Sequence, residues 1–263
     1  MNRALYVAKT GLEAQQFRLA AISNNIANAN TYAYKAGRAE FDDLMYQNVR
    51  QPGAQASQNE SSTLPSGLQL GTGVKAIGVQ KIHTQGNLVV TDNQLDLAIE
   101  GKGFFQALDQ NGDLMYTRDG SFQVNQDGDV VTSSGYLLEP NINIPQNSTD
   151  ISITRDGAVF VTEPGNTAQT QVGQIELSTF MNPAGLQAMG HNFYTETTAS
   201  GTANVINPQT AEAGSLTQGA LEASNVNTVE ELIGMIEAQR TYEMNSKAIS
   251  AADGMMQYLN NNI

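Results

Sequence analysis

Cysteine is absent from this chain of 263 residues, and histidine occurs only twice. Without cysteine the chain forms no disulfide, no thiolate metal site and no cysteine nucleophile. His83 and His191 have no second histidine or carboxylate at a metal-ligand spacing. We therefore interpret each histidine as a core or solvent-facing residue, and we expect no metal and no cofactor.

Positive charge is also scarce, with 13 Lys and Arg residues against 26 Asp and Glu residues and a net charge of −13. Nucleic acids and anionic membranes bind clustered Lys and Arg, so neither is an expected partner. No run approaches the roughly 20 apolar residues of a membrane span. Residues 1–12 lack the layout and cleavage site of a secretory signal. We expect a soluble protein, exported, if at all, without a cleaved signal.

Each end of the chain carries an apolar stripe with steps of three and four residues. The N-terminal stripe is Leu5, Ala8, Leu12, Gln15, Leu19, Ile22, Ile26 and Ala29, and the C-terminal stripe is Met235, Ala238, Tyr242, Asn245, Ile249, Ala252, Met256 and Leu259. This spacing is typical of a helix seam that buries a narrow stripe against another helix. Two matched seams predict that the terminal helices pair, although a core helix of an ordinary domain would show the same periodicity. Gln15 and Asn245 interrupt the seams, either to fix the register or because they lie at a seam edge.

Residues near the ends of the two predicted helices indicate where each helix begins or ends. We expect the first helix over residues 2–28, where several asparagines near its end indicate either fraying or amides presented to neighbouring chains. The last helix has two plausible caps, Asn227 with Glu230 and Thr228 with Glu231. The first helix is net basic and the last net acidic, which favours their pairing weakly.

The middle of the chain reads as β structure over residues 71–194. Short apolar runs alternate with turns, and four dipeptides predict hairpins because their turn residues tolerate positive φ: Asn111-Gly112, Asp119-Gly120, Asp127-Gly128 and Asp156-Gly157. The first of these hairpins is expected to bring Leu114, Tyr116 and Phe122 onto a shared apolar face.

The predicted fold class is α+β, with paired long N- and C-terminal helices forming a coiled-coil core that flanks a mainly antiparallel β domain. We divide the chain into residues 1–46 (first helix and adjoining segment), 47–70 (polar segment), 71–194 (β domain), 195–223 (connector) and 224–263 (last helix). By composition alone, the polar segment is either a flexible linker or a segment that becomes ordered against a partner.

The sequence contains few residues in patterns that indicate an active site. Gly101-Lys102-Gly103 lacks the remaining residues of a phosphate loop and reads as a tight turn. Asp109, Asn111 and Asp113 open like a calcium loop, but Gly112 comes too early, which favours a hairpin. No catalytic residue is assigned, and we predict that the protein is not an enzyme. A β domain that holds a carbohydrate or peptide stays an alternative, as does an enzyme with carboxylates in that domain.

Specific runs occur at both ends and in the middle of the chain. They include Ser23 to Thr31 followed by Tyr34-Lys35, Tyr116 to Gly120, and Ser224 to Lys247. In these runs the chain resembles the bacterial flagellar rod and hook proteins. The residues that carry the terminal signatures are Asn24, Asn25, Ala27, Asn28, Thr31, Lys35, Asn225, Glu230, Glu231, Gln239 and Arg240. The chain departs from the family at Tyr32-Ala33-Tyr34, where Asn-Gly is common. Without the glycine, a residue that readily adopts positive φ is lost, so the resemblance does not define the backbone conformation here.

Within that family, the length and the polar stretch that contains Arg50, Gln51, Pro52 and Gly53 favour a subunit of the distal rod. The resemblance implies a structural subunit that polymerises into a hollow helical filament and transmits torque from motor to hook. It implies proximal rod subunits, hook subunits and the surrounding ring as neighbours. It also implies export by the flagellar type III apparatus into a rod that crosses the periplasm. A proximal rod or hook-type subunit is the alternative.

A long helix with an unprotected apolar seam is only marginally stable alone. We therefore expect the end segments to be largely disordered in free subunits and to become ordered on polymerisation.

Overall fold

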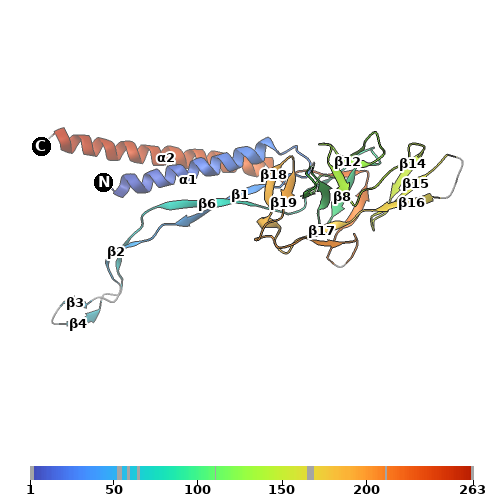
Figure 1. Ribbon diagram of the computed structural model, residues 1–263. Coiled ribbons are helices and arrows are strands. Elements are labelled where there is room, and N and C mark those ends of the chain that lie inside the picture. The colour runs from blue at the N-terminus through green and yellow to red at the C-terminus, as the bar shows by residue number, and fades with distance from the viewer. Residues whose placement is uncertain are drawn as a thin grey trace. The chain divides into compact units, whose positions relative to one another are not determined.

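The computed structural model describes residues 3–51, 55–57, 60–63, 66–109, 111–164, 169–210 and 212–261. Contacts divide the chain into two units (Figure 1). Met1–Ala27, Gly37–Gln80 and Asn227–Ile263 form the first, here called the helical unit, and Asn28–Ala36 and Lys81–Val226 form the second, the β unit. With a helix at each end and many antiparallel strands, the fold is α+β, as predicted.

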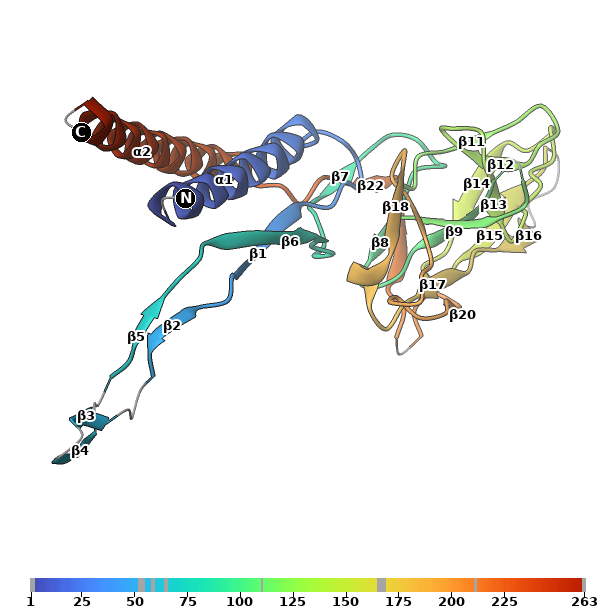
Figure 2. The ribbon, with the colours of Figure 1, turned by 60° about the vertical axis from the view of Figure 1, so that its left-hand side comes forward.

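Two long helices, α1 (Arg3–Ala27) and α2 (Thr228–Asn261), pack side by side in the helical unit (Figures 1 and 2). They run antiparallel, because the start of α2 lies beside the end of α1. Arg18 forms an ion pair of 3.6 Å with Glu237. Further along α2 and closer to the start of α1, a Cβ added at Gly11 would lie 3.0 Å from the Asn245 amide nitrogen. A glycine at this point allows the two helices to approach closely.

The start of α2 is capped by Asn227, the first member of one of the two predicted cap pairs. Its side-chain oxygen accepts a hydrogen bond of 3.2 Å from the backbone N–H of Val229. Its carbonyl accepts the first helical bond from the Glu231 N–H at 3.0 Å. Both contacts satisfy groups that the helix itself leaves without partners.

A second face of α1 covers a β ribbon formed by β1 (Gly37–Asp43) and β6 (Val74–Lys81). Phe17 of α1 meets Phe41 edge to face, with ring centroids 6.4 Å apart. Thr10, which is buried, accepts a hydrogen bond of 3.4 Å from the Val74 N–H through its hydroxyl. The first helix is therefore covered on two faces, by α2 and by the ribbon.

The polar segment continues the ribbon as further strand pairs (Figure 2). These are β2 (Gln47–Arg50) with β5 (Leu68–Leu70), and β3 (Gln55–Ser57) with β4 (Glu60–Thr63). The flexible-linker interpretation is wrong for these strands. Their residues pair in an antiparallel register that composition alone does not reveal.

The β unit consists of short antiparallel strands around an apolar core. The largest sheet has the order β11-β12-β13-β9-β10-β19-β18. Its strands are β9 (Phe105–Leu108), β10 (Leu114–Thr117), β11 (Phe122–Val124), β12 (Val130–Thr132), β13 (Leu137–Glu139), β18 (Gln187–Gly190) and β19 (Phe193–Thr195), and the 3-10 helix η1 (Pro183–Gly185) precedes β18. Beside it are a sheet of β14 (Asp150–Ile153), β15 (Ala158–Thr162) and β16 (Gln169–Gln174) and the pair β17 (Leu177–Thr179) and β20 (Asn204–Ile206). Two more pairs join β7 (Leu88–Val90) with β22 (Ala220–Glu222) and β8 (Leu97–Glu100) with β21 (Ser215–Gln218).

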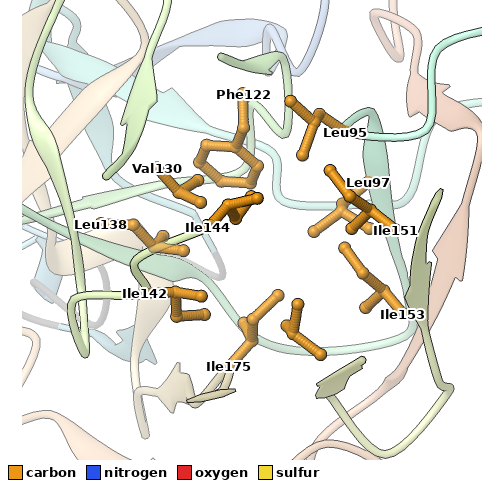
Figure 3. A pocket seen from close by; sticks show the side chains of 11 residues that line it. Leu95, Leu97, Phe122, Val130, Leu138, Ile142, Ile144, Ile151, Ile153 and Ile175 are labelled. Carbon is orange, nitrogen blue, oxygen red and sulfur yellow. The ribbon is translucent and has the colours of Figure 1, made fainter. Parts of the chain in front are cut away.

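The core of this unit is a cluster of aliphatic side chains with two phenylalanines. Figure 3 shows how several of them converge, among them Leu97, Phe122 and Leu138 from three strands and Ile175 from the residue after β16. Phe105 packs edge to face on Phe122, with ring centroids 5.1 Å apart. A separate cluster gathers Phe104, Tyr116, Leu186 and Tyr194.

Three of the four predicted hairpins are present, and in each the glycine has positive φ: Gly112 between β9 and β10, Gly128 between β11 and β12, and Gly157 between β14 and β15. The prediction at Asp119-Gly120 is wrong, because β10 and β11 do not pair with each other. Gly120 instead lets two backbones meet, since a Cβ there would lie 1.8 Å from the Leu97 carbonyl oxygen.

The expected shared apolar face is also wrong. Leu114 is exposed, Tyr116 belongs to the second cluster and Phe122 belongs to the main core. The reason is that β11 leaves the β9–β10 hairpin and pairs with β12 instead.

The connector interpretation of residues 195–223 does not describe their structure. This stretch contains β20, β21 and β22, and Leu216 of β21 is buried in the main core. Small and polar residues predominate in these short strands, so composition gave no strand signal.

Candidate functional site

The two predicted seams lie on covered sides of the paired helices. On α1, Ile22 is buried, and Leu5, Leu12, Gln15, Leu19 and Ile26 are partly covered. On α2, Ala238 and Ala252 are buried, Met235, Tyr242, Asn245 and Ile249 are partly covered, and Met256 is exposed. Leu259 falls within α2, among residues whose side chains the structure does not describe. Most of the described stripe residues are therefore at least partly covered.

The polar residues of the seams have different surroundings. The side-chain oxygen of Gln15 is buried without a hydrogen-bond partner among the described residues. Asn245 lies against Gly11 of the partner helix. Beside the seam, the Gln16 amide donates to the Tyr242 hydroxyl at 3.4 Å.

A second apolar face of α2 is exposed. Val229, Leu232, Ile233 and Ile236 of its first turns are each at least half exposed, as are Met255 and Tyr258 near its end. Exposed apolar residues scattered singly are normal, but a contiguous group on one helix usually marks a surface that becomes covered. None of the described residues covers this face.

Asn25 joins three segments of the helical unit through one buried carboxamide. Its oxygen accepts the Gly37 N–H at 2.8 Å, and its amide nitrogen donates to the Gly37 carbonyl at 2.9 Å and to the Glu231 carboxylate at 2.8 Å. Only a side chain with a donor and an acceptor can make this set of bonds. Of the motif residues, Asn25 and Glu231 are therefore in direct contact.

The other motif residues of the two helices make local contacts or lie on the surface. Thr31 donates a hydrogen bond of 3.2 Å to the Asn28 side chain. Asn24 and Ala27 lie exposed near the end of α1, and Glu230, Gln239 and Arg240 are exposed on α2.

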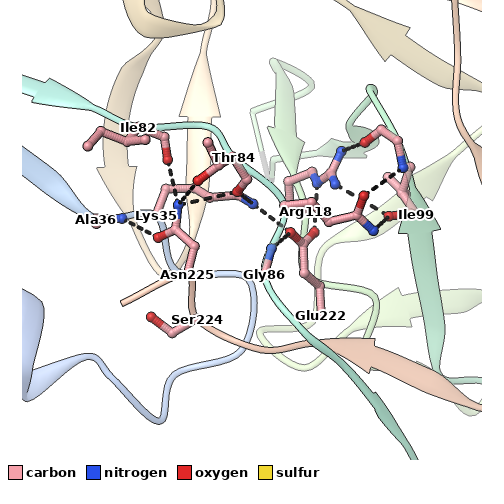
Figure 4. A network of polar contacts seen from close by, with 12 residues as sticks. Lys35, Ala36, Ile82, Thr84, Gly86, Ile99, Arg118, Glu222, Ser224 and Asn225 are labelled. Atoms are coloured by element: carbon pink, nitrogen blue, oxygen red, sulfur yellow. Dashed lines mark hydrogen bonds and ion pairs between the residues drawn. The ribbon is translucent and has the colours of Figure 1, made fainter. Parts of the chain in front are cut away.

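A buried cluster of three charges lies in the β unit (Figure 4). Lys35 Nζ is 2.6 Å from one Glu222 oxygen, and Arg118 Nε is 2.9 Å from the other. The Gly86 N–H also donates to the Glu222 carboxylate at 2.8 Å. The side chains of Lys35, Glu222 and Arg118 are only 1%, 0% and 6% exposed, so this cluster is shielded from water.

Burial and charge act in opposite directions within the cluster. Burial alone would raise the pKa of the Glu222 carboxyl, but Arg118 and Lys35 together hold that pKa below its usual value. Burial lowers the pKa of the Lys35 ammonium, and Glu222 opposes this shift. The carboxylate is thus the group that keeps two buried cations in place.

Asn225 ties the same region to the backbone. Its side-chain oxygen accepts the Ala36 N–H at 2.7 Å, and its amide nitrogen donates to the Ile82 carbonyl and the Thr84 hydroxyl at 2.8 and 2.9 Å. Lys35 and Asn225, predicted from opposite ends of the chain, therefore fix one junction of residues 33–36, 82–86 and 222–225.

The departure from the family pattern at Tyr32-Ala33-Tyr34 does not abolish the unusual backbone. Ala33 is buried with φ of 57°, and its N–H donates to the Glu222 carbonyl at 2.7 Å. An alanine thus occupies a left-handed conformation that costs about 1–2 kcal/mol for a residue with a Cβ.

The sequence did not indicate Glu222 as a central residue, although its partner Arg118 lies within the Tyr116 to Gly120 run that resembles the flagellar family. A glutamate flanked by Leu221 and Ala223 in an apolar run is a weak signal of a buried carboxylate. Its partner Lys35 lies 187 residues away, so spacing could not connect the two.

The predicted rod-type residues lie at the end of β2. Arg50 is the exposed last residue of that strand and Gln51 follows it, also exposed. Pro52 and Gly53 lie outside the described residues.

Two features are absent from the described part of the chain. No group of three or more His, Asp or Glu residues there is arranged to hold a metal ion. Neither described helix has the length and hydropathy that a membrane span requires.

Models of flagellar protein families match this chain at both ends and in the middle. Residues 5–35 match the family model of the flagella basal body rod protein, and residues 98–161 match the flagellar hook protein FlgE/F/G D1 domain. Residues 217–262 match the flagellar basal body rod FlgEFG protein C-terminal model.

Three relatives illustrate the similarity over the full length. The flagellar basal-body rod protein FlgG of Buchnera aphidicola (subsp. Acyrthosiphon pisum) is 51% identical over 98% of this chain and 99% of its own. Proteins of the same name from Caulobacter vibrioides and Bacillus subtilis are 48% and 37% identical, over 97% and 99% of both chains. The chain therefore belongs to the flagellar basal-body rod protein family and is a structural component of that rod.

Proposed function

We propose that this protein is a subunit of the distal rod, which polymerises into a hollow helical filament and transmits torque from motor to hook. The observation that carries the proposal is the similarity to FlgG proteins over nearly the whole chain. Its neighbours would be further copies of itself, proximal rod subunits, hook subunits and the surrounding ring. Delivery by the flagellar type III export apparatus, across the periplasm and without a cleaved signal, is part of the same proposal.

In this proposal the paired helices form the coiled-coil core of the filament. The seam residues hold α1 to α2, and the exposed apolar face of α2 is buried against neighbouring subunits. Burial of apolar surface contributes about 25 cal/mol per Å², which offsets the entropy lost on ordering. A head-to-tail contact that does not close into a ring generates a helical filament. Residues 1–46 and 224–263 would line the core, and residues 71–194 would form the outer layer.

The ribbon of β2 and β5 supports a contact between subunits. All residues of both strands are exposed, among them Val49 and Leu68. An isolated two-stranded ribbon is marginally stable in water. We therefore propose that the rod-type segment around Arg50 packs on neighbouring copies and stiffens the shaft.

Electron microscopy of concentrated purified protein tests polymerisation. The double variant Ile233→Asp/Ile236→Asp places charge on the exposed face of α2 without touching the seam. We expect unchanged circular dichroism of the dilute protein and loss of filaments. Gln123→Asp on β11 is the matched control, because it adds a charge at an exposed polar position. Filaments of the double variant as long as those of the control would refute the role of this face.

Deletion of residues 50–65 separates the distal rod from the alternatives within the family. A distal rod subunit should then form a polymer that bends, whereas a proximal rod or hook-type subunit should form filaments of unchanged stiffness. The persistence length measured from micrographs distinguishes these outcomes.

A further inference from the structure

A pocket of about 190 Å³ lies in the β unit beside the buried charge cluster. Its lining includes the cations Lys35, Lys102 and Arg118 together with His83 and the rings of Phe104 and Phe180. A single water needs roughly 10–15 Å³ of such volume, so the pocket has room for a small polyatomic ligand. All of these residues belong to the same unit of the chain.

The charges at the base of the pocket do not balance. Two buried cations, Lys35 and Arg118, share the single carboxylate of Glu222. Among the described residues, the Lys35 ammonium donates to two acceptors, the Glu222 carboxylate and the Thr84 carbonyl, whereas an ammonium carries three donors. A buried charge without full compensation is costly, so this site favours the arrival of a negative group.

Lys102 adds a third cation at the exposed side of the pocket. Its side chain forms no hydrogen bond or ion pair with any described residue, and the residue is exposed. It is held in a turn between β8 and β9, where Gly101 and Gly103 both have positive φ. The turn that the sequence suggested thus places an exposed lysine in the lining of a cationic pocket.

His83 provides a second, independent sign of the same chemistry. Neither of its ring nitrogens has a hydrogen-bond partner among the described residues, although both are buried. The ring is held edge to face by Phe104 and Tyr194, with centroids 5.7 and 5.6 Å away. One nitrogen of a neutral imidazole is a donor. His83 therefore adds a donor to the lining of a pocket in which one donor of Lys35 also has no acceptor among the described residues.

The charges around His83 are mainly positive, which also favours an anion in the pocket. Burial, followed by the charges of Lys35, Arg118 and Lys81, lowers the pKa of His83 to about 4, and Glu222 opposes the shift. Three cations and one carboxylate thus act on this ring, and the local field is positive.

We propose that this pocket is a binding site for a small oxyanion, a phosphate or carboxylate group, which Lys102 contacts and which the positive charges of Lys35 and Arg118 attract. The oxygens of such a group supply acceptors for the Lys102 ammonium, and charge-assisted bonds of this kind are roughly twice as strong as neutral ones. Phe104 and Phe180 form the apolar walls. A free phosphate and the carboxylate of another polypeptide share this chemistry.

Nuclear magnetic resonance of the two histidine side chains tests the proposal on the full-length dilute protein. Inorganic phosphate is titrated at pH 7 and constant ionic strength, with sodium chloride as the reference salt. We expect a saturable shift of the His83 signals with a Kd on the order of 1 mM, and no saturable shift of His191. Acetate in place of phosphate tests the carboxylate source, and saturation by either anion supports the oxyanion site.

Two lysine variants decide whether the pocket is responsible. Lys102→Gln should raise the Kd of the anion at least about fivefold, because a charge-assisted bond is lost. Lys75→Gln on β6 changes another exposed lysine, which is not part of the pocket lining, and should bind like the parent. A His83 shift that does not saturate with either anion, or equal affinities of the two variants, would overturn the proposal.

Discussion

Replacing Glu222 with glutamine should destabilise the β unit more than any surface charge change. Glutamine has the same shape but no charge, so Lys35 and Arg118 would stay buried without their counter-ion. Removing one partner of a buried ion pair costs about 3–5 kcal/mol. The bonds at stake are the Lys35 contact of 2.6 Å, the Arg118 contact of 2.9 Å and the Gly86 N–H bond of 2.8 Å.

The matched control is Glu40→Gln, which removes an exposed ion pair with Arg38. That pair has an N–O distance of 3.2 Å, but its side chains are 63% and 42% exposed. Exposed pairs contribute about 0–1 kcal/mol, because water screens them. The two variants therefore remove the same charge from environments that differ in burial.

Urea unfolding followed by circular dichroism measures the difference. With a slope of about 2 kcal/mol per M urea, Glu222→Gln should lower the midpoint by about 2 M and Glu40→Gln by less than about 0.5 M. Adding Lys35→Met to Glu222→Gln should recover part of the loss, since one uncompensated cation is removed. Equal midpoints for Glu222→Gln and Glu40→Gln would show that the cluster does not contribute to stability in this way.

Three further predictions concern pH, backbone strain and helix packing. Below pH 6.5 the unfolded chain binds a proton at His83 that the folded chain, with a pKa of about 4 there, does not bind. Stability should therefore fall by about 1.4 kcal/mol per pH unit, roughly 3 kcal/mol in total down to pH 4, and urea midpoints of His83→Phe should lack this dependence. Ala33→Gly should raise the free energy of unfolding by about 0.5–1 kcal/mol, because glycine relieves the left-handed strain but loses more entropy on folding; a lower thermal midpoint would contradict this. Gly11→Leu should lower the free energy of unfolding by about 1–3 kcal/mol, because the new side chain pushes against Asn245. Gly254→Leu should leave it unchanged, since an added Cβ there has nothing within 4 Å. Equal loss of helix content of the two variants on heating would rule out close packing at Gly11.

The sequence revealed the features that depend on local or periodic patterns. The positions of both terminal helices followed from apolar steps of three and four residues, because a helix that buries one face must repeat in this way. The cap at Asn227 and the hairpin glycines at 112, 128 and 157 followed from chemistry within a few residues. Such signals are short-range, and no other part of the chain overrides them here.

Features that depend on distant partners could not be predicted in the same way. Gly120 was expected in a hairpin, but its role is the close approach of the Leu97 backbone. The pairing of β21 with β8 and of β22 with β7 joins segments more than a hundred residues apart, and short strands of small residues carry little information on their register. The cluster around Glu222 needed the tertiary fold, since neither its depth nor its partners can be read from its neighbours.

The junction of Lys35 and Asn225 with Glu222 has a consequence for the order of folding. The β unit combines residues 28–36 with the strand pairs made by residues 215–222. A chain that has formed only its local hairpins therefore lacks the strand pairs that complete this unit. Contacts with such large sequence separation form slowly, so we expect the β unit to close after its hairpins have formed.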